Sequence, residues 1–146
     1  MKEVILEEQR KDPKGNESNV KAWHSSWDTH LQSANYEPII DLAMSSIDFI
    51  SNNFFKAFNK FKLFNFWVMI YEEGEYTVPH THFPSTFACV YYVDVEEGCS
   101  PLVFEDKLEV KPENGLLVIF PAILKHEVPP TKGRRIAISM NIENDV

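Results

Sequence analysis

Cysteine is scarce in this sequence, and no long apolar run is present. The chain has 146 residues and two cysteines, Cys89 and Cys99, which cannot form a disulfide scaffold. It contains no CxxC pair, which argues against a metal knuckle. The longest nearly apolar run, 115–124, reaches only half of the roughly 20 residues that cross a bilayer. We therefore expect neither a disulfide-rich domain nor a membrane-spanning protein.

Positive charge is also in deficit, because 14 lysine and arginine residues face 22 aspartate and glutamate residues, for a net charge of −8. General nucleic-acid and anionic-membrane binders need a basic face, so this balance argues against both, although it leaves room for a small basic patch. The first residues, MKEVILEEQRK, are too charged for the apolar segment of a secretory signal. We expect a soluble, cytoplasmic protein with reduced cysteines. An exposed sheet edge would also allow two copies to associate as an oligomer.

The composition instead fits one folded domain over residues 1–146. Hydrophobic residues make up 44% of the chain, enough for a core, and charged residues make up 25%, too balanced for a disordered chain. We expect residues 1–62 to form a largely helical N-terminal elaboration. Within it, 12–19 is a run of turn formers that predicts a loop, and 23–36 predicts a short helix or an irregular segment over the core.

The clearest helical pattern runs from Glu37 to Phe61. Its apolar residues recur at the i, i+3, i+4, i+7 spacing that gives a helix one apolar face, and Pro38 suits the first turn. Asn52 and Asn53 are weak helix formers, so we expect the helix to break or kink there. The apolar stripe consists of Ile39, Ile40, Ala43, Met44, Ile47, Ile50, Phe54 and Phe58.

From residue 63 onward, short runs of β-branched and aromatic residues alternate with glycine, proline and acidic turns. Their spacing, without helices between them, favours an antiparallel sandwich or barrel over βαβ units. The predicted fold class is α+β and mainly β, with a jelly roll over 63–142 that follows the helices. The predicted strands are 63–71, 86–95, 102–104, 108–110, 116–120 and 134–142.

Three histidines form the candidate metal site. His80 and His82 are two residues apart, so in an extended backbone their imidazoles project to the same face. His126 follows an apolar strand, and in a rolled sandwich two such strands can face each other. Three protein ligands on one face of an ion leave positions open for substrate, as a catalytic site requires. We assign His24 and His30, in the polar N-terminal segment, to the surface or to capping roles.

The residues around these histidines resemble a known signature. The stretch 71–82 resembles the Y-x-x-G-x-x-Y-x-P-H-x-D signature of prolyl-hydroxylase-like Fe(II)/2-oxoglutarate oxygenases. Its matching residues are Tyr71, Gly74, Pro79 and His80, whereas the second tyrosine is displaced to Tyr76 and His82 stands at the aspartate position. Residues 115–121, then His126, and Arg135 nine positions later resemble the second half of that signature.

A smaller group of 2-oxoglutarate–Fe(II) oxygenases shares the HxH form of this pattern. The similarity covers residues 63–142 and also includes Trp67, the segment 88–93 and the segment 135–141. The resemblance implies a double-stranded β-helix core with the helical part packed outside it. It also implies that His80 and His126 bind the metal. His82 is the third ligand we expect, with Asp94 or Glu105 as the alternative source of a carboxylate.

The resemblance also implies a cosubstrate site. Arg135 would pair with the C5 carboxylate of 2-oxoglutarate, because a guanidinium matches a carboxylate in a two-pronged fashion. The other residues that we assign to the cosubstrate are Tyr71, Tyr91, Ser139 and Asn141. Tyr91 and Tyr92 alternate, so only one of them can point inward, and Arg134 points away from Arg135. We expect Trp67 to belong to the core together with Phe54, Phe55, Phe58, Phe61, Phe64 and Phe66.

The implied activity is a dioxygenase reaction that needs Fe(II) and 2-oxoglutarate, hydroxylates an unidentified substrate and releases succinate and CO2. Three neutral imidazoles would leave the full charge of Fe(II) uncompensated. They should therefore strengthen its attraction for dianionic 2-oxoglutarate and raise its redox potential, which bears on activity and on metal identity. Imidazole also suits zinc, copper and nickel. A halogenase is disfavoured, because it needs a small residue where His82 stands.

Two other readings stay open. Gly74, His80 and His82 also fit the cupin pattern G(x)5HxH, in which three-histidine oxygenases need no 2-oxoglutarate. The cupin glutamate is absent, however, since Thr86 and Phe87 occupy its positions, and 112–115 is not followed by histidine at the required spacing. The third reading is a non-enzymatic binding module, which would lose nothing when its metal is removed.

Overall fold

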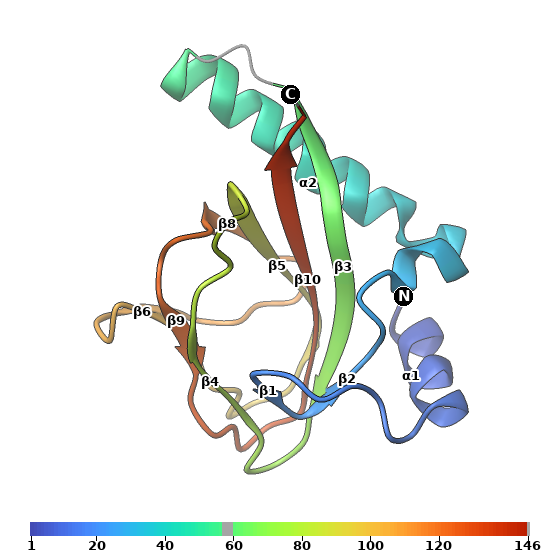
Figure 1. Ribbon diagram of the computed structural model, residues 1–146. Helices are drawn as coiled ribbons and strands as arrows, with labels where there is room; N and C mark the ends of the chain where they lie inside the picture. The colour runs from blue at the N-terminus through green and yellow to red at the C-terminus, as the bar shows by residue number, and fades with distance from the viewer. Residues whose placement is uncertain (57–59, 146) are drawn as a thin grey trace.

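Two antiparallel sheets of five strands each face one another in the computed structural model, which describes residues 1–56 and 60–145 (Figure 1). One sheet has the order β1-β4-β9-β6-β7, formed by Val20–Lys21, Tyr76–His80, His126–Val128, Leu102–Phe104 and Leu108–Val110. The other has the order β2-β3-β10-β5-β8, formed by Trp23–His24, Phe61–Tyr71, Arg135–Asn144, Phe87–Val95 and Leu117–Pro121. The chain is a mainly-β jelly roll, as its strand spacing predicts.

The six predicted strands are confirmed, with ends that move by one or two residues. Sequence patterning misses the short strands β1, β2, β4 and β9. β4 contains Pro79, and β9 has three residues and runs into Pro129 and Pro130. Proline within or directly after a segment argues against a strand. Two of the missed strands, β4 and β9, carry candidate metal ligands.

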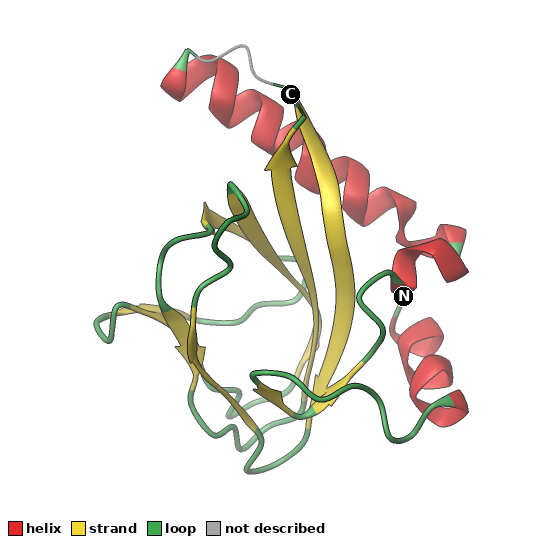
Figure 2. Ribbon diagram, in the orientation of Figure 1, coloured by secondary structure: helices red, strands yellow, loops and turns green. Residues whose placement is uncertain are grey.

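Two helices cover the outer face of the β2-β3-β10-β5-β8 sheet (Figure 2). Helix α1, Lys2–Lys11, contributes Ile5 to that layer, and helix α2, Glu37–Ile50, contributes Ile39, Ala43 and Ile47. None of the helices within the described residues is long and apolar enough to cross a membrane.

The long predicted helix is shorter than its pattern suggests. After Ile50 the chain makes a π-helical turn, Ser51–Phe55. This turn ends at Lys56, which has the left-handed conformation with a φ of 50°. The break falls at the two asparagines, as expected for weak helix formers. Phe58 and the rest of residues 57–59 lie outside the described residues.

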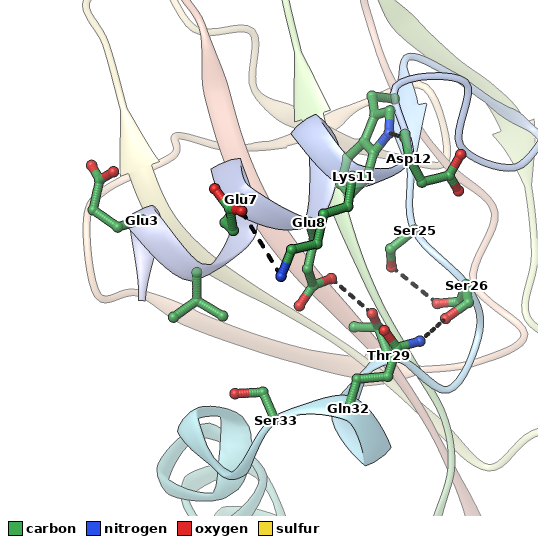
Figure 3. Close-up of a pocket in the computed structure, with 12 residues that line it drawn as sticks. Glu3, Glu7, Glu8, Lys11, Asp12, Ser25, Ser26, Thr29, Gln32 and Ser33 are labelled. Carbon is green, nitrogen blue, oxygen red and sulfur yellow. Dashed lines mark hydrogen bonds and ion pairs between the residues drawn. The ribbon is translucent and has the colours of Figure 1, made fainter.

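Helix α1 is tied to the body by one carboxylate. Glu8 accepts a hydrogen bond from the hydroxyl of Thr29 in a hollow of about 530 Å³ (Figure 3). It also accepts one from the hydroxyl of Tyr36. Burial, with the neighbouring carboxylate, raises the pKa of Tyr36. Of the other acids of this hollow, Glu3 and Glu7 pair with Arg10, Glu7 also lies near Lys11, and Asp12 accepts from the backbone N–H of Gly15. The hollow is therefore a packing seam.

For the segment 23–36, the second of the two predicted forms, an irregular segment over the core, is confirmed. It contains short 3-10 turns at Thr29–Gln32 and Ala34–Tyr36. The surface assignment of His24 is wrong, because its side chain is fully buried. Its ring stacks on Trp67 and is covered by the edge of Trp27. The polar sequence around His24 hid this burial, which depends on a distant strand. His30 is half-buried against Phe66.

The expected phenylalanine core is only partly correct. Phe66 is fully buried and Phe61 packs against the same cluster, whereas Phe54, Phe55 and Phe64 are more than half exposed. Phe64 falls at an irregularity of the β3–β10 ladder, where Asn141 pairs with Asn65 and Ile142 already pairs with Leu63. Such a bulge re-aims a side chain, so Phe64 faces solvent instead of the core.

Strand β10 lies between β3 and β5 and pairs with both. Its even-numbered residues from Ile136 to Ile142 pack toward the helices. Its odd-numbered residues, which include Arg135, Ser139 and Asn141, face the space between the sheets, because successive side chains of a strand alternate. This alternation supplies the interior with its polar side chains.

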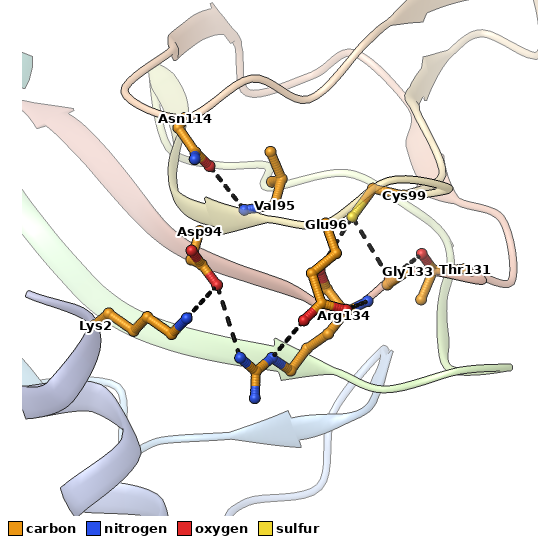
Figure 4. Close-up of polar contacts among 9 residues, drawn as sticks. All are labelled: Lys2, Asp94, Val95, Glu96, Cys99, Asn114, Thr131, Gly133 and Arg134. Carbon is orange, nitrogen blue, oxygen red and sulfur yellow. Dashed lines mark hydrogen bonds and ion pairs between the residues drawn. The ribbon is translucent and has the colours of Figure 1, made fainter.

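A surface network holds the start of β10 in place (Figure 4). Arg134 contacts Asp94 at 3.8 Å and Glu96 at 3.7 Å, and Asp94 also pairs with Lys2 of α1 at 2.9 Å. Arg134 therefore points away from its neighbour Arg135, as strand alternation predicts.

We predict that Gly133→Ala lowers the free energy of unfolding by about 3 kcal/mol, the upper part of the range for overpacking. A Cβ at Gly133 would lie 2.2 Å from the carbonyl oxygen of Glu97. The matched control is Gly74→Ala, where no atom lies within 4 Å and only the φ of 85° opposes alanine, at about 1 kcal/mol. Urea denaturation measures both, and equal losses would contradict the steric explanation.

We predict that His24 makes stability depend on pH. Burial lowers the pKa of His24 below its ordinary value of 6.5, so the unfolded chain binds a proton more readily than the folded chain. This contribution is therefore full above pH 6.5 and is lost as the pH falls from there toward the lowered pKa. Urea denaturation between pH 7 and 5 should show that the free energy of unfolding falls less steeply with decreasing pH in His24→Gln than in the wild type. Parallel curves would refute this assignment.

Candidate metal centre

The histidines meet because of one strand pairing. His80 ends β4 and His126 begins β9, and the two residues are direct partners in the β4–β9 ladder. His82 lies in the loop after β4, and its own backbone N–H donates to the carbonyl of Ala122 at 2.8 Å. The two-residue spacing and the β4–β9 register thus bring three imidazoles to one end of the interior.

The three rings form one cluster. Their potential ligand atoms all lie within 4.8 Å of one another, and Nε2 of His82 is 3.1 Å from Nε2 of His126. The ring of His80 is 4.4 Å from that of His126 and 4.9 Å from that of His82, between centroids. No cation or carboxylate separates the rings in the described residues, so the cluster offers three neutral nitrogen donors to one ion.

Backbone carbonyls orient two of the rings. Nδ1 of His80 lies 2.8 Å from the carbonyl oxygen of Val78, and Nδ1 of His126 lies 2.9 Å from that of Leu124. A carbonyl only accepts, so each Nδ1 carries the proton and each Nε2 keeps a lone pair. Histidines that bind metals commonly donate their second N–H in this way.

Burial also keeps the rings uncharged. It lowers the pKa of His80, lowers that of His126 to about 4, and lowers that of His82 to about 3 with added repulsion from the other two histidines. A neutral imidazole is the form that binds metal. The donor set, its protonation and its orientation therefore all fit a resident transition-metal ion.

His82 takes its second partner from β10. The Nδ2 group of Asn141 donates to Oδ1 of Asn65, its register partner on β3, at 3.3 Å. This turns Oδ1 of Asn141 toward His82, whose pKa that contact raises. No hydrogen bond of standard geometry satisfies Oδ1 of Asn141, so the contact is a loose one. Asn141 therefore lies beside the ring of His82 without a direct hydrogen bond of standard geometry to it.

The other end of the same interior holds a buried positive charge. Arg135 is 1% exposed, and it forms no ion pair within the described part of the chain. One Nη donates to the carbonyl of Ser100 at 3.0 Å, while Nε has no partner. Its guanidinium lies 4.9 Å from the ring centre of Tyr71 and 5.2 Å from that of Tyr92. A buried charge without a counter-ion is costly, so this end of the cavity favours an anion.

The two ends share one cavity. A narrow internal space of about 30 Å³ is lined by the three histidines and also by Tyr71, Arg135 and Ser139. The Tyr71 hydroxyl contacts that of Thr77 at 2.5 Å, and the Tyr92 hydroxyl is buried without a partner. An end lined by three imidazoles and an end lined by a guanidinium therefore share the space between the sheets.

This arrangement occurs on a known fold. A viral collagen prolyl hydroxylase from Paramecium bursaria Chlorella virus-1, solved as a 2OG complex, matches with a TM-score of 0.68 and 20% identity, over 99% of this chain and 89% of that one. A prolyl-4-hydroxylase from Pseudomonas putida matches with a TM-score of 0.66 and 19% identity, over 99% and 85%. A prolyl hydroxylase from Trichoplax adhaerens, solved with a peptide fragment of hypoxia inducible factor, matches with 0.73 and 18%, over 98% and 76%.

The fold is that of the prolyl hydroxylases. No family model matches the sequence. No curated protein matches it either. At these identities the likeness establishes the double-stranded β-helix, and the chemistry of the site has to be argued from its own residues.

Most of the predicted site residues come together in this fold. The three histidines, Tyr71, Arg135 and Ser139 line one cavity, and Asn141 lies beside His82. The alternative carboxylates lie elsewhere: Asp94 pairs with Lys2 and Arg134, and Glu105 accepts from the backbone of Lys125.

The assignment of Tyr91 is wrong. Its side chain packs on the helix-covered side of the sheet, whereas Tyr92 points inward beside Arg135. Strand alternation leaves this choice open, and the β5–β10 ladder also shifts register between Ile136 and Ala137. Sequence reasoning missed Thr77 and Ser100 as well, because both act through one hydrogen bond that only the fold creates.

We predict that Asn141→Leu weakens metal binding by about 10- to 100-fold, the usual effect of removing a group that orients a ligand histidine. Competition with a chromophoric chelator for Co(II) measures the affinity. Ser139→Ala, on the same face of β10, is the matched control and should bind Co(II) like the wild type. Equal affinity in Asn141→Leu and wild type would show that Asn141 does not orient His82.

Proposed function

We propose that this protein is an Fe(II)- and 2-oxoglutarate-dependent dioxygenase that hydroxylates a substrate and releases succinate and CO2. His80, His82 and His126 would hold the iron. Arg135 would bind the distal carboxylate of 2-oxoglutarate, with Tyr71 and Tyr92 beside it. The likeness in fold to prolyl hydroxylases, one of them solved with 2OG, supports the same proposal.

One observation carries this proposal: a buried guanidinium without a carboxylate partner shares a cavity with three neutral imidazoles. A metal site alone gives no reason to bury Arg135. A linear dicarboxylate explains both ends, because one carboxylate can reach the ion while the other meets the guanidinium. The cavity of about 30 Å³ is narrower than such a molecule, so its walls have to part on binding.

When bound, the iron and 2-oxoglutarate supply the oxidising chemistry, in which O2 gives one oxygen atom to succinate and one to a C–H bond of the substrate. The protein's residues supply position and environment. Nδ1–H groups held by Val78 and Leu124 keep two imidazoles aimed at the ion. The apolar residues around Phe104 and Phe120 keep water away from His126.

The charges of the proposed complex are complementary and leave one net positive charge. Three neutral imidazoles leave two positive charges on Fe(II), and Arg135 adds a third. The two carboxylates of 2-oxoglutarate offset two of these charges, and in a low-dielectric interior such attraction is strong. The replacement of the usual aspartate by His82 therefore favours retention of a dianionic ligand.

The first experiment adds Fe(II) and then 2-oxoglutarate to the metal-free protein under anaerobic conditions. Formation of the chelated complex gives a weak visible charge-transfer band. We expect the band in the wild type and its loss in His82→Ala, through weaker iron binding. We expect Arg135→Met to bind iron normally and 2-oxoglutarate about 100-fold less tightly, as for removal of one partner of a buried charge pair.

Arg134→Met is the matched control, because it removes an equal charge from the neighbouring residue on the other face of β10. It should bind 2-oxoglutarate like the wild type. Arg135→Met should stay folded, since removing an unpaired buried charge relieves a cost. Iron binding without a band would favour a three-histidine metalloprotein that needs no 2-oxoglutarate, and failure to bind any metal would favour a binding module.

A further inference from the structure

A second hollow opens beside the histidine cluster and continues to the surface. This outer groove encloses about 380 Å³, within the range of about 300–1,000 Å³ that is usual for small-molecule sites. Its lining includes His80 and His82, so a ligand in the groove lies next to the candidate metal centre. Three aromatic side chains of the lining are conspicuously exposed: Trp27 at 41%, Phe64 at 53% and Phe83 at 74%.

The aromatic rings connect the surface to the metal centre. The ring of Trp27 is 4.9 Å from that of Trp67, and the ring of Trp67 is 5.7 Å from that of His82, between centroids. Trp27 comes from the irregular segment before α2, Trp67 from β3 and His82 from the loop after β4. A ligand that packs on these rings is therefore directed toward the three imidazoles.

The ionised lining of the groove is acidic. Among the described residues, no lysine or arginine lines it, and its one carboxylate belongs to Glu143 on β10. Glu143 is half-buried and forms no ion pair in the described part of the chain. Lys62 lies directly opposite it in the β3–β10 ladder but pairs with Asp145, at 3.8 Å. The carboxylate of Glu143 is thus free to meet a positive group.

We propose that the outer groove binds an alkylammonium group and that this group belongs to the substrate. Aromatic faces attract cations through their quadrupole, and a nearby carboxylate adds a direct charge interaction. The net charge of −8 attracts cations to the protein over longer distances. Among the described residues that line the groove, no lysine or arginine offers an ion pair to an anionic substrate. Only the assignment of the bound amine as the substrate rests on the proposed dioxygenase activity.

The test uses two probes of equal shape, choline and its uncharged analogue 3,3-dimethylbutan-1-ol. Each is titrated into the metal-free protein without 2-oxoglutarate, and tryptophan fluorescence reports binding, because Trp27 lies in the groove. We expect choline to reach half-saturation at a concentration about tenfold lower than the alcohol. This readout needs neither iron nor turnover, so its outcome is separate from that of the dioxygenase proposal.

Glu143→Gln should remove most of the difference between the two probes. Glu113→Gln is the matched control, because it removes an equal charge from an exposed residue that does not line the groove. Trp27→Ala should weaken choline binding, as followed by NMR shifts of the probe. Equal binding of the two probes, or equal effects of the two glutamate variants, would overturn the proposal.

Three further probes distinguish the source of the amine. Tighter binding of N-acetyl-lysine methylamide than of butylammonium supports a lysine side chain of a polypeptide. The reverse order supports a free amine as the substrate. Preference for N-acetyl-proline methylamide over both would overturn the assignment to an ammonium group.

Discussion

The interior of this protein depends on strand β10, which from Arg135 to Ile142 is paired on both sides and buried on both faces. Its pleat sends isoleucines and a methionine to the helices and sends Arg135, Ser139 and Asn141 between the sheets. A shift of one residue would exchange the two sets, putting a guanidinium beneath α2 and isoleucine in the cavity. The burial of both faces therefore fixes the register, and the register places the polar side chains.

The cavity that results has two chemically different ends. Three imidazoles, kept neutral by burial, form one end, and the unpaired guanidinium of Arg135 forms the other. Each is unfavourable without a ligand, because lone pairs and a charge are both removed from water. A metal ion and a dicarboxylate would satisfy both at once. The polar interior therefore lowers the stability of the folded protein, and a bound metal ion and dicarboxylate would offset that cost.

The three candidate metal ligands could be predicted from the sequence, because the two-residue spacing of His80 and His82 and the motif around His126 are local patterns. The strands that carry two of these histidines could not, since Pro79 lies within β4 and Pro129 and Pro130 directly follow β9, and proline argues against a strand. Tyr91 was assigned in place of Tyr92 because a strand pattern gives the alternation but not which face is inward. The polar neighbours of His24 predict a surface position for it, yet the rings of Trp27 and Trp67 bury it.

The sequence by itself determined that a helical part precedes the main strands, the mainly-β class and the residue types able to bind a metal and an anion. Those follow from local spacing and side-chain chemistry, which the linear chain already contains. Tertiary structure alone decided that Arg135 has no counter-ion among the described residues, that Asn141 lies beside His82, and that Trp27, Phe64 and Glu143 border one groove. These facts depend on which strands become neighbours, and that is settled by the packing of the whole chain.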